Sequence, residues 1–541
     1  MHIREVHVVN FRCFKGRFDL ELTEGTNIIV GDNDAGKSTI IEAINMALSG
    51  TTNGRFVSTE INQYMFNSEI VEGYLARTNN GENTDLPEIT IEIVFSDDAP
   101  AILEGNGNLD KTKSRGIALH VGFDTDYSSE YQALITGEGE ITTLPIEYYR
   151  SIWTTFARDI IGVRSIPMKA AIIDTTAVRF HNGADIYISR IVRDHLSESE
   201  RVKLAQAYRK MRESFIQSGS IEAINAQISK AADVPENKLT VSTNLTTKSA
   251  WETILSTYLD NIPFQQIGKG TQSIVKTKLA LARAPGKKPN VILLEEPECH
   301  LTHANLNTLL SALTETAGIQ QVVVSTHSSF VANKLGIDDL ILLHRGKTIR
   351  FSSLQNQTRD FFRKLPGFDT LRMLLCKRVV LVEGPSDELV FQRAYMDATS
   401  GRLPIQDGID VMSVALTFKR FLEIGRLLHK PMGIITDNDG NHVKNVIEKF
   451  KEYDNMKYMR VFADNRDSLP TLEPQIVDAN VQQLDILREI LGITAKMYPG
   501  QEEVSTYMQK NKVQSALAVF DAQKGIKYPK YIEEAVAWCR E

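Results

Sequence analysis

The sequence predicts an α/β protein built from more than one domain. Three observations support this: the chain has 541 residues, a glycine-rich loop at residues 31–38 lies between an apolar segment and a helix-forming one, and a second set of apolar segments ending in acids begins near residue 378. Alternating strand and helix patterns are typical of sheets covered by helices. Because domains usually contain about 100 to 200 residues, we expect two or three of them.

The composition is that of an ordinary soluble globular protein. Hydrophobic residues make up 42% and charged residues 24%, and no stretch approaches the roughly 20 apolar residues that span a bilayer. The opening, MHIREVHVVNFRCF, lacks the apolar core of a secretory signal, so we expect a cytoplasmic protein without a membrane partner. A net charge of −7 argues against nonspecific coating of nucleic acid but allows a local basic groove. The widely separated cysteines are expected to be reduced thiols: Cys13, Cys299, Cys376 and Cys539.

The first part of the chain, residues 1–165, is expected to form the N-terminal portion of an ATPase domain. Apolar residues at 6–9 and 26–30 predict two strands, and residues 38–48 predict a helix after the glycine-rich loop. This strand, loop and helix form a phosphate-binding unit. Further β-like segments near residues 91–98 and 117–123 predict a β-rich lobe.

The pattern becomes helical in the next segment, residues 166–239. Apolar residues recur at spacings of three and four between residues 186 and 230, which predicts one or two long helices. We expect this insert to dimerise, although a solvated helical face would give the same pattern. Strand-like segments resume at 240–350, a linker is expected at 351–370, and a second α/β domain at 371–541.

The glycine-rich loop GDNDAGKS matches the P-loop pattern. Glycines allow backbone N–H groups to face phosphate, Lys37 supplies a positive charge, and the Ser38 hydroxyl can ligate Mg²⁺. A purely structural turn is the alternative, but the preceding strand and following helix favour ATP binding. The residues expected to bind ATP here are Gly31, Asn33, Gly36, Lys37, Ser38 and Thr39.

An apolar segment, VILLEEPECHL, ends in two acids that suit the second half of an ATPase site. Glu295 would support Mg²⁺ and Glu296 would activate water. Taken alone, two acids after a strand could be a solvated loop. The glutamate at position 295, where ATPases of this type usually carry aspartate, has a longer side chain and leaves the metal geometry open.

Two later segments resemble the signature and switch-histidine segments of ABC-type ATPases. They are IGKGTQSIVKTKLAL, from residue 267, and VVVSTHSS, which places His327 at a strand end. The resemblance implies that the signature of one protomer caps ATP bound to another, so the active unit would be a dimer, with His327 contacting the γ-phosphate. A structural role for His327 is the alternative. The signature residues implied are Gly268, Gly270 and Gln272.

The opening VVNFRCF and the order of motifs resemble SMC-like ABC ATPases. The distance from P-loop to signature is too short for their long coiled-coil arms, so we expect a short helical insert instead.

The downstream domain carries acids at the ends of two apolar segments. RVVLVEGPSDELVF places Glu383 after a strand and Asp387 at a helix start, and MGIITDNDGNH places Asp437 and Asp439 after another strand. Because neighbouring parallel strands end at one edge of a sheet, these acids can converge on one or two Mg²⁺ ions. The EGxxD and DxD pair resembles the Toprim fold, with helix caps and an acidic turn as the alternative.

An ABC-type ATPase with a short helical insert, followed by Toprim, resembles the OLD (overcoming lysogenization defect) family over nearly the whole chain. The resemblance implies ATP-regulated DNA cleavage that uses two metal ions, Mg²⁺ with Mn²⁺ as an alternative. It also implies a further acid, for which Glu473 is the candidate, and a lysine, for which Lys512 and Lys524 compete. Ordinary surface roles remain the alternative for all three.

The resemblance further implies a homodimer or higher oligomer that acts in anti-phage defence, with partner subunits as a possibility. Two other functions stay open on the sequence: an ATP-switched DNA-binding or repair mediator that cleaves little, and an RNase that cuts tRNA. The activating trigger and the DNA sequence preference are not predicted.

Overall fold

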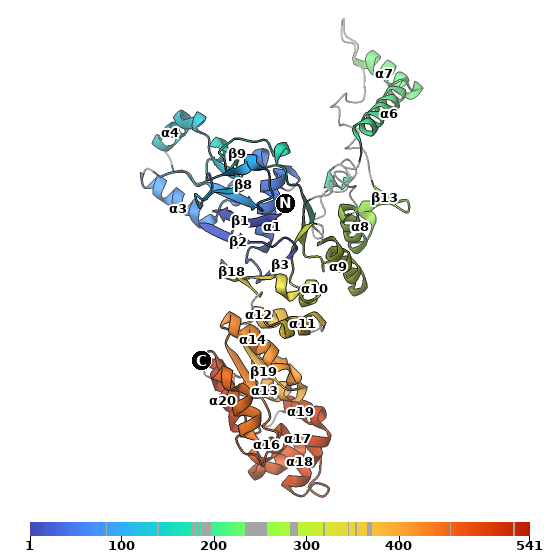
Figure 1. Ribbon diagram of the computed structural model, residues 1–541. Helices are drawn as coiled ribbons and strands as arrows, with labels where there is room; N and C mark the ends of the chain where they lie inside the picture. The colour runs from blue at the N-terminus through green and yellow to red at the C-terminus, as the bar shows by residue number, and fades with distance from the viewer. Residues whose placement is uncertain are drawn as a thin grey trace. The chain divides into compact units, whose positions relative to one another are not determined.

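The structure is a computed structural model (Figure 1), and it describes all residues except 53, 83, 138–139, 175–179, 182–183, 186–195, 233–256, 282–289, 318–319, 345, 352–353, 365–369, 455 and 523–524. The chain forms two compact units: unit 1 contains Met1–His327 and Ile341–Thr348, and unit 2 contains Ser328–Leu340 and Ile349–Glu541. The first part of the strand-like region expected from residue 240 lies outside the described residues. Among the helices described, none combines the length and apolar character needed to cross a bilayer.

A six-stranded sheet with a parallel core carries the P-loop, in the order β10-β15-β16-β3-β17-β18. Strands β10, β15, β16 and β3 pair in parallel. The central strands are nearly continuous Val, Ile and Leu, which is typical of strands covered on both faces. Their bounds are Thr26–Gly31 (β3), Ala170–Asp174 (β10), Val291–Glu295 (β15), Gln321–Ser325 (β16), Leu340–His344 (β17) and Lys347–Arg350 (β18).

Helix α1, Lys37–Ser49, contacts both sheets of unit 1, and most of its side chains are buried. It packs on β3, β15 and β16 and also on β6 and β8 of the second sheet. An all-round buried helix needs the apolar sequence seen here, STIIEAINMALS. Helices α8 (Lys269–Leu281) and α9 (His303–Ala317) contact each other, and they contact β10 and β16 respectively.

The second sheet of unit 1 is antiparallel, in the order β2-β1-β6-β8-β7, with β9 paired to β8. It confirms the predicted β-rich lobe. The bounds are Ile3–Val9 (β1), Arg17–Glu21 (β2), Ile89–Phe95 (β6), Glu104–Gly105 (β7), Ser114–Phe123 (β8) and Tyr149–Thr155 (β9), with α2 at Val57–Glu60, α3 at Ser68–Asn79 and α4 at Ser128–Thr136. Short pairs are β4–β5 (Thr51–Thr52, Arg55–Phe56), β11–β12 (Phe180–His181, Ala184–Asp185) and β13–β14 (Tyr258–Leu259, Ile262–Pro263).

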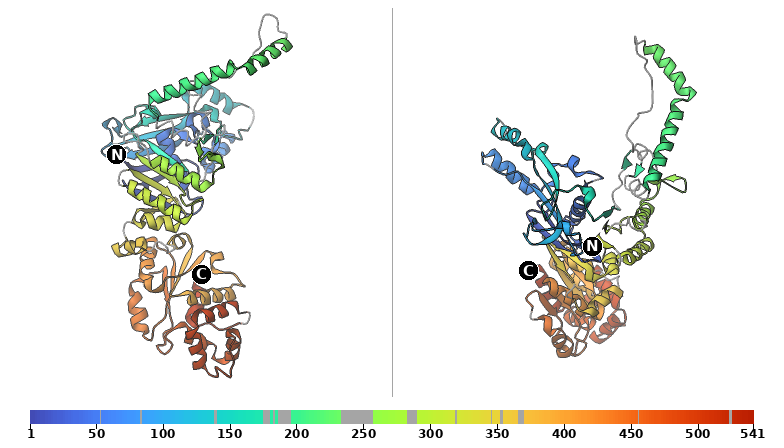
Figure 2. Two further views of the ribbon diagram at one scale, coloured as in Figure 1. Left: turned by 90° about the vertical axis from the view of Figure 1, so that its right-hand side faces the viewer. Right: turned by 45° about the horizontal axis from the view of Figure 1, so that its top comes forward.

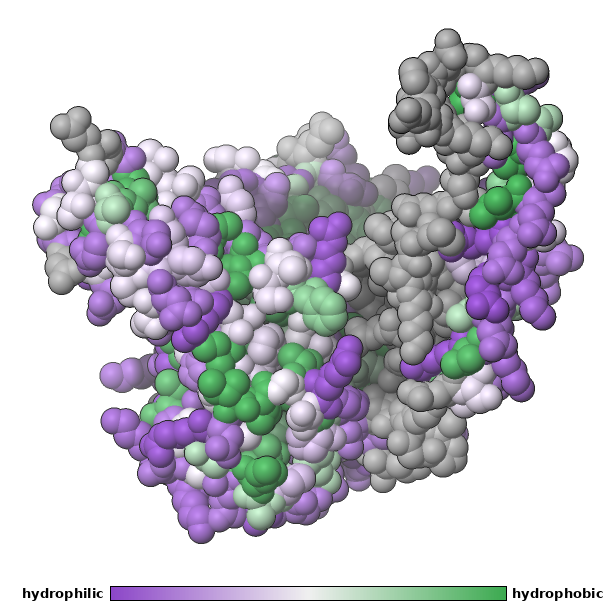
Figure 3. All heavy atoms as spheres, turned by 90° about the horizontal axis from the view of Figure 1, so that it is seen from above, coloured by the Kyte–Doolittle hydropathy of each residue, from purple (hydrophilic) through white to green (hydrophobic). Residues whose placement is uncertain are grey.

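Two helices lie in the predicted insert, α6 (Glu198–Ile216) and α7 (Gly219–Ala232). Helix α6 begins with a capping box, because Ser197 and Glu200 each accept the other's backbone N–H. Figure 3 shows a mainly hydrophilic surface on these helices with isolated hydrophobic residues, and Met211 and Phe215 are more than half exposed. Strand β10 falls inside the range expected for the insert, yet it pairs with β15 in the ATPase sheet.

Unit 2 contains a four-stranded parallel sheet in the order β20-β19-β21-β22, and Figure 2 shows it with helices on both sides. Gly425 of α14 packs on Met432 on one face, and Trp538 of α20 packs on Gly433 on the other. The strands are Arg378–Val382 (β19), Ile409–Ser413 (β20), Met432–Ile435 (β21) and Met459–Phe462 (β22). The helices are Pro385–Ala398 (α13), Phe418–Leu428 (α14), Lys449–Asp454 (α15), Leu472–Ala479 (α16), Leu484–Leu491 (α17), Gln501–Lys510 (α18), Lys512–Asp521 (α19) and Lys530–Arg540 (α20), with a π-helix at Val443–Glu448.

The segment expected as a linker contains helix α11, Asn356–Lys364. It contacts α10 (Ser329–Leu335) and α14, and α12 (Thr370–Leu375) also contacts α10. Buried Thr358 donates a hydrogen bond to Glu423 of α14. Unit 2 therefore includes packed helices that precede the expected start of the domain at residue 371.

Candidate active sites

The P-loop joins β3 to α1 through a turn that requires glycine. Gly36 has φ of +102°, and a Cβ there would lie 2.5 Å from Cζ of Phe14. A Cβ on Gly31 would lie 2.8 Å from the carbonyl oxygen of Leu343. The loop is thus held by close packing on both sides, which fixes where its backbone N–H groups point.

Lys37 is buried, and its ammonium group donates hydrogen bonds within the loop. Nζ lies 3.0 Å from the carbonyl oxygen of Gly31 and 2.8 Å from that of Asp32. Burial lowers the pKa of Lys37, while the charges of Glu296 and Asp32 oppose that change. The ammonium group is positioned by carbonyl oxygens that phosphate oxygens can replace.

The remaining P-loop residues differ in exposure. Asn33 and Ser38 are exposed, so the Ser38 hydroxyl is available for a ligand. Thr39 is buried, and its hydroxyl oxygen accepts a hydrogen bond from Sγ of Cys13 at 3.5 Å. The Thr39 side chain therefore packs against the segment that contains Cys13.

The structure brings the two acids after β15 to the same sheet edge as the P-loop. Strand β16 lies between β3 and β15, and Ser325 pairs with both Ile29 and Glu295. Glu296 follows with φ of +42°, and its N–H donates to the carbonyl of Ser325 at 2.9 Å. Its Oε1 lies 3.5 Å from Nε2 of His327, so the expected water-activating acid and switch histidine are adjacent.

Glu298 also belongs to this site, although the sequence motifs assigned it no role. Its Oε1 accepts hydrogen bonds from the Thr326 hydroxyl at 2.8 Å and from the His327 backbone N–H at 2.9 Å. These bonds tie the loop after β15 to the loop after β16, which orients the histidine. The sequence shows Glu298 as the third acid of EEPE, but it does not indicate that this side chain accepts hydrogen bonds from residues 326 and 327.

The expected signature residues lie at the start of α8. A Cβ on Gly270 would lie 2.5 Å from the carbonyl oxygen of His300, whereas Gly268 has open space around it. Gln272 is buried, and its amide donates to the carbonyls of Phe264 at 2.9 Å and Ile267 at 2.8 Å. In this structure the Gln272 side chain therefore shapes the turn before α8.

The carboxyl edge of the four-stranded sheet of unit 2 holds the second group of acids. Glu383 follows β19, and its Oε1 accepts hydrogen bonds from the Thr436 hydroxyl at 2.6 Å and the Asp437 N–H at 3.2 Å. Strand β20 lies on one side of β19, and β21 and β22 lie on the other side. The order of the strands therefore changes direction between β19 and β21. Crevices at such switch points are where α/β sheets bind ligands.

Asp387 and Asp437 are carboxyl groups with perturbed acidity. Asp387 accepts the N–H of Gly384 at 2.9 Å, and burial raises its pKa to about 6, with the charge of Glu383 adding to the effect. Burial, followed by the charges of Asp387, Glu383 and Glu473, raises the pKa of Asp437 to about 8. These carboxylates lie close enough to repel one another.

Glu473 and Lys512 join this group from the helical part of unit 2. Glu473, in the first turn of α16, is buried, and its Oε2 accepts a hydrogen bond from Thr471 at 2.9 Å. Its Oε1 lies 3.4 Å from Nζ of half-exposed Lys512, the first residue of α19. The rival Lys524 lies outside the described residues.

Asp439 is exposed, with φ of +48°, and its N–H donates to the carbonyl of Pro470 at 3.1 Å. Asn438 lies between the two aspartates, and the sequence motifs assigned it no role. It is fully buried, and its amide donates to the carbonyls of residues 464, 466 and 469 at 2.9–3.1 Å, while its Oδ1 accepts the N–H of Gly440 at 2.8 Å. Asn438 thus holds the DND turn against the loop after β22.

The Toprim acids suit divalent cations by their chemistry. Oxygen ligands are those that Mg²⁺ prefers. Burial, and then the charges of the neighbouring carboxylates, raise the pKa of Asp437, and a bound cation would oppose both effects. In the described part of the chain, three possible ligand atoms also lie within 4.8 Å of one another at a different place, on Glu5, His7 and Asp110.

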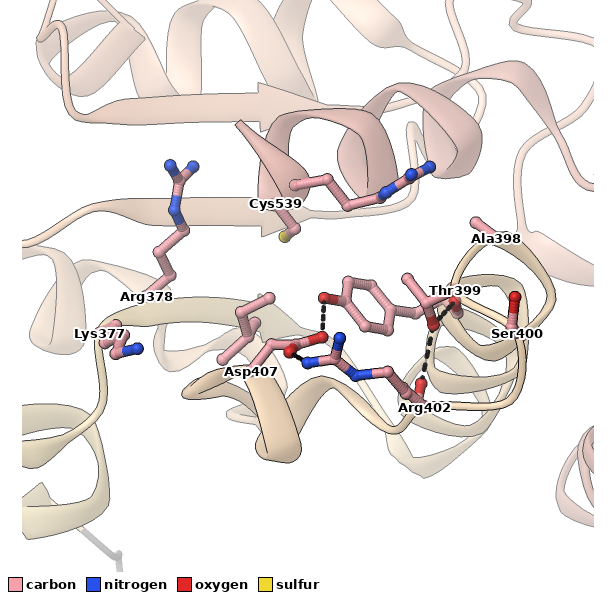
Figure 4. Close-up of a pocket in the computed structure, with 11 residues that line it drawn as sticks. Lys377, Arg378, Ala398, Thr399, Ser400, Arg402, Asp407 and Cys539 are labelled. Atoms are coloured by element: carbon pink, nitrogen blue, oxygen red, sulfur yellow. Dashed lines mark hydrogen bonds and ion pairs between the residues drawn. The ribbon is translucent and has the colours of Figure 1, made fainter.

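A separate cavity of about 500 Å³ lies at the opposite edge of the Toprim sheet (Figure 4). Its lining includes the first residues of β19 and β20, whereas the acids follow the last residues of the strands. Asp407 in this cavity pairs with Arg402 and accepts a hydrogen bond from the Tyr395 hydroxyl at 2.7 Å. The cavity is not part of the acidic site. Its basic lining residues are Lys377, Arg378, Arg402 and Arg540.

Three family models match segments of the chain. Residues 5–166 match an AAA domain, and residues 178–333 match a second AAA domain model described as a putative AbiEii toxin of a type IV toxin–antitoxin system. Residues 374–439 match the Toprim domain of overcoming-lysogenization-defect-like proteins. Each matched segment contains one of the motif groups described above.

Curated relatives are similar over short segments. Elongation factor 3 of Candida albicans is 34% identical over 107 residues, which is 20% of this chain and 9% of that protein. The DNA replication and repair protein RecF of Clostridium botulinum is 30% identical over 86 residues, 16% of this chain and 23% of that protein. The chain thus spans less than a quarter of the length of either relative.

Solved structures with partial similarity include an Smc head bound to the C-terminal winged-helix domain of ScpA, with a TM-score of 0.33, 13% identity and coverage of 65% of this chain and 99% of that one. The C-terminal region of the Burkholderia pseudomallei OLD protein has a TM-score of 0.25 and 18% identity, covering 31% of this chain and 98% of that one.

Together, the sheets, the motifs and the family matches define the chain as a P-loop ATPase joined to a Toprim domain. The Toprim domain is OLD-like, which confirms the resemblance to the OLD family inferred from the motifs. The predicted α/β fold class is likewise confirmed.

Proposed function

We propose that this protein is an ATP-regulated, divalent-metal-dependent DNA endonuclease of the OLD type. The observation that carries the proposal is the gathering of carboxylates with a lysine at the carboxyl edge of the Toprim sheet. Carboxylates that repel one another, next to a partly exposed cation, suit binding of metal ions and a phosphodiester. The residues are Glu383, Asp387, Asp437, Asp439, Glu473 and Lys512.

Within this site the residues have different roles. The Thr436 hydroxyl and the Asp437 backbone N–H hold the Glu383 carboxylate beside Asp437, so that both residues can offer oxygen ligands. Lys512, held by Glu473, can stabilise charge that develops on the phosphate. Mg²⁺, or Mn²⁺ in its place, would supply water activation and leaving-group stabilisation when bound.

The P-loop site is proposed to bind and hydrolyse ATP as the control input. Lys37 would exchange its carbonyl partners for phosphate oxygens, Ser38 and Glu295 would hold Mg²⁺, and Glu296 would orient water beside His327. Gly268, Gly270 and Gln272 are proposed to act across a homodimer that the exposed apolar residues of α6 help to form. Backbone groups around Gln272 would make that contact, because its side chain is engaged.

The resemblance to the OLD family supports a cytoplasmic role in defence against phage, with partner subunits. The similarity to RecF, a DNA replication and repair protein, supports DNA as the target class.

A cleavage assay with matched variants tests the proposal. Supercoiled plasmid is incubated with the full chain and Mg²⁺ or Mn²⁺, with and without ATP. Asp437→Asn is expected to abolish nicking and cutting while ATP hydrolysis survives, and exposed Asp521→Asn at the end of α19 is the matched control. Lys37→Ala is expected to stop ATP hydrolysis, with exposed Lys347→Ala as its control.

The other functions give different results in the same assay. ATP-dependent retention of DNA without cleavage of supercoiled, linear or single-stranded substrates would indicate a DNA-binding mediator. Cleavage of tRNA with intact plasmid would indicate an RNase. Cutting that persists in both Asp437→Asn and Lys37→Ala would contradict the proposed site.

A further inference from the structure

A polar row crosses the antiparallel sheet of unit 1, away from the P-loop and its acids. His7 of β1 pairs with Asp19 of β2 on one side and with Glu92 of β6 on the other. Residues directly opposite in antiparallel strands point to the same face of the sheet. Three ionisable side chains are therefore aligned on one face.

The orientation of His7 is set by Asp19. His7 is 3% exposed, and its Nδ1 lies 2.6 Å from Oδ1 of Asp19. Nη2 of Arg17, which can only donate, also lies 3.4 Å from Nδ1. The closer partner is the Asp19 carboxylate, which only accepts, so a neutral His7 ring carries its proton on Nδ1 and its lone pair on Nε2. A carboxylate that holds a histidine in this way is the usual support of a metal-binding imidazole.

The lone-pair side of His7 faces two more carboxylates. Nε2 lies 3.7 Å from Oε2 of Glu5 and 3.6 Å from Oδ2 of Asp110, and the three ligand atoms lie within 4.8 Å of one another. Bonds of about 2.0–2.2 Å to a tetrahedral Zn²⁺ place ligand atoms about 3.3–3.6 Å apart. The two distances from Nε2 are close to that geometry, and the two carboxylate oxygens lie within 4.8 Å of each other.

Glu92 gives a second, independent indication of a ligand. Its side chain is 2% exposed, and its Oε2 is buried without a hydrogen-bond partner in the described part of the structure. Its Oε1 accepts the N–H of Leu109 at 2.9 Å, next to Asp110, and Glu92 lies directly opposite His7 on the same face of the sheet. A buried carboxylate oxygen without a partner is costly unless a cation pairs with it.

Guanidinium groups pair with three of the four acids around His7. Arg17 pairs with Asp19 and Asp110 at 2.6 Å each, and Arg4 pairs with Glu5 at 2.9 Å. Burial raises the pKa of the fourth acid, Glu92, to about 7, which is the direction expected of a buried carboxyl group.

We propose that Glu5, His7 and Asp110 bind one Zn²⁺ ion beside the buried carboxyl group of Glu92, in a site distinct from the ATP and nuclease centres. The mixed nitrogen and oxygen ligands favour a transition metal over Mg²⁺. The ion connects β1 to the loop between β7 and β8, and so fixes that loop on the sheet.

The test measures Zn²⁺ binding to the full chain in an Asp437→Asn background, which weakens competition from the Toprim acids. Metal-stripped protein is titrated with Zn²⁺ by calorimetry, and Co²⁺ replaces Zn²⁺ for visible spectra of a four-coordinate site. His7→Gln is expected to lose one equivalent of Zn²⁺ and the Co²⁺ bands, and exposed His344→Gln should retain both. Asp19→Asn should weaken binding by about 10- to 100-fold, since it removes the support of the ring.

Retained ATP binding and circular dichroism show that each variant is folded, and Asp110→Asn provides a second ligand variant if His7→Gln does not fold. Loss of one equivalent in either ligand variant supports the site. Equal Zn²⁺ stoichiometry in the parent and both ligand variants would overturn it. So would a melting temperature that falls in His7→Gln by the same amount with and without Zn²⁺, which would show that His7 is only a member of an ion-pair network.

Discussion

The two candidate active sites lie at the carboxyl edges of two parallel sheets, yet their electrostatics are opposite. In unit 1 a buried cation, Lys37, is satisfied by carbonyl oxygens of its own loop. In unit 2 acidic side chains around Asp437 raise its pKa to about 8, with burial as the larger cause. The first site is preorganised to receive an anion, whereas the second requires cations before it can receive one.

The two sites also differ in the groups that hold their functional side chains. Around the P-loop, backbone groups and Glu298 hold the functional side chains, so the geometry does not depend on a ligand. Around Asp437, the turn is held by Asn438, but the carboxylates themselves repel. Variants that change support or charge in one unit should therefore leave the geometry of the other site unchanged, even where ATP controls cleavage.

The largest effect is expected from Glu296→Gln. Removing the carboxylate that lies beside His327 should lower the rate of ATP hydrolysis by about 10²- to 10⁴-fold, the usual contribution of a general base. Binding of ATP should persist, because Lys37 and the P-loop are unchanged. Phosphate release and equilibrium binding of a fluorescent ATP analogue measure the two quantities, and unaltered hydrolysis would remove Glu296 from the mechanism.

A smaller effect is expected from Asn438→Ala in the other unit. The substitution removes three hydrogen bonds from the DND turn to the loop after β22, so the ligands lose their orientation. Metal-dependent plasmid cleavage should fall by about 10- to 100-fold, as when support of a metal ligand is lost. ATP hydrolysis should be unchanged. Equal losses of both activities would point to general unfolding instead.

Glu298→Gln should reduce ATP hydrolysis by about tenfold, less than Glu296→Gln, because Glu298 acts through the backbone N–H of His327. The amide retains one acceptor but loses the charge. A comparison of kcat and KM for the two variants separates positioning from chemistry. An effect of Glu298→Gln as large as that of Glu296→Gln would mean that Glu298 contacts the reacting groups.

The smallest effect concerns the stability of metal-free unit 2. Since the folded-state pKa of Asp437 is raised from 3.8 to about 8, its contribution to stability is full below about pH 4 and is lost as the pH rises through 8. In EDTA the melting temperature should decline by a few degrees over this range, and Asp437→Asn should flatten the decline. Differential scanning fluorimetry measures this, with Asp521→Asn as the control. A decline of equal size in Asp437→Asn would assign it to other groups.

Local patterns were sufficient for much of the fold and for the identity of many candidate residues. GDNDAGKS, EEPE and the two acidic strand ends are contiguous motifs whose flanking apolar segments define strand and helix. Because parallel strands end at a common edge, the approach of Glu383 to Asp437 was also predictable, and the structure shows it. The role of each residue in catalysis stays a prediction.

Other features depend on partners far apart in the chain. Glu298, Asn438 and Gln272 act through backbone atoms of other segments, and no periodicity indicates which carbonyl or N–H a side chain will meet. Likewise, β10 belongs to the ATPase sheet because it pairs with β15, about 120 residues later in the sequence. Its few apolar residues did not distinguish it from the start of the helical insert.

The two-part α/β organisation, the P-loop and the acids at strand ends were predictable from the sequence alone, since residue type and spacing within short segments encode each of them. Contacts between residues far apart in the chain became visible in the tertiary structure. Glu473 contacts Lys512 from another helix. The polar group around His7 combines residues of β1, β2 and β6 with the loop between β7 and β8. The physical reason is that strand register and helix packing, rather than local propensity, set these distances.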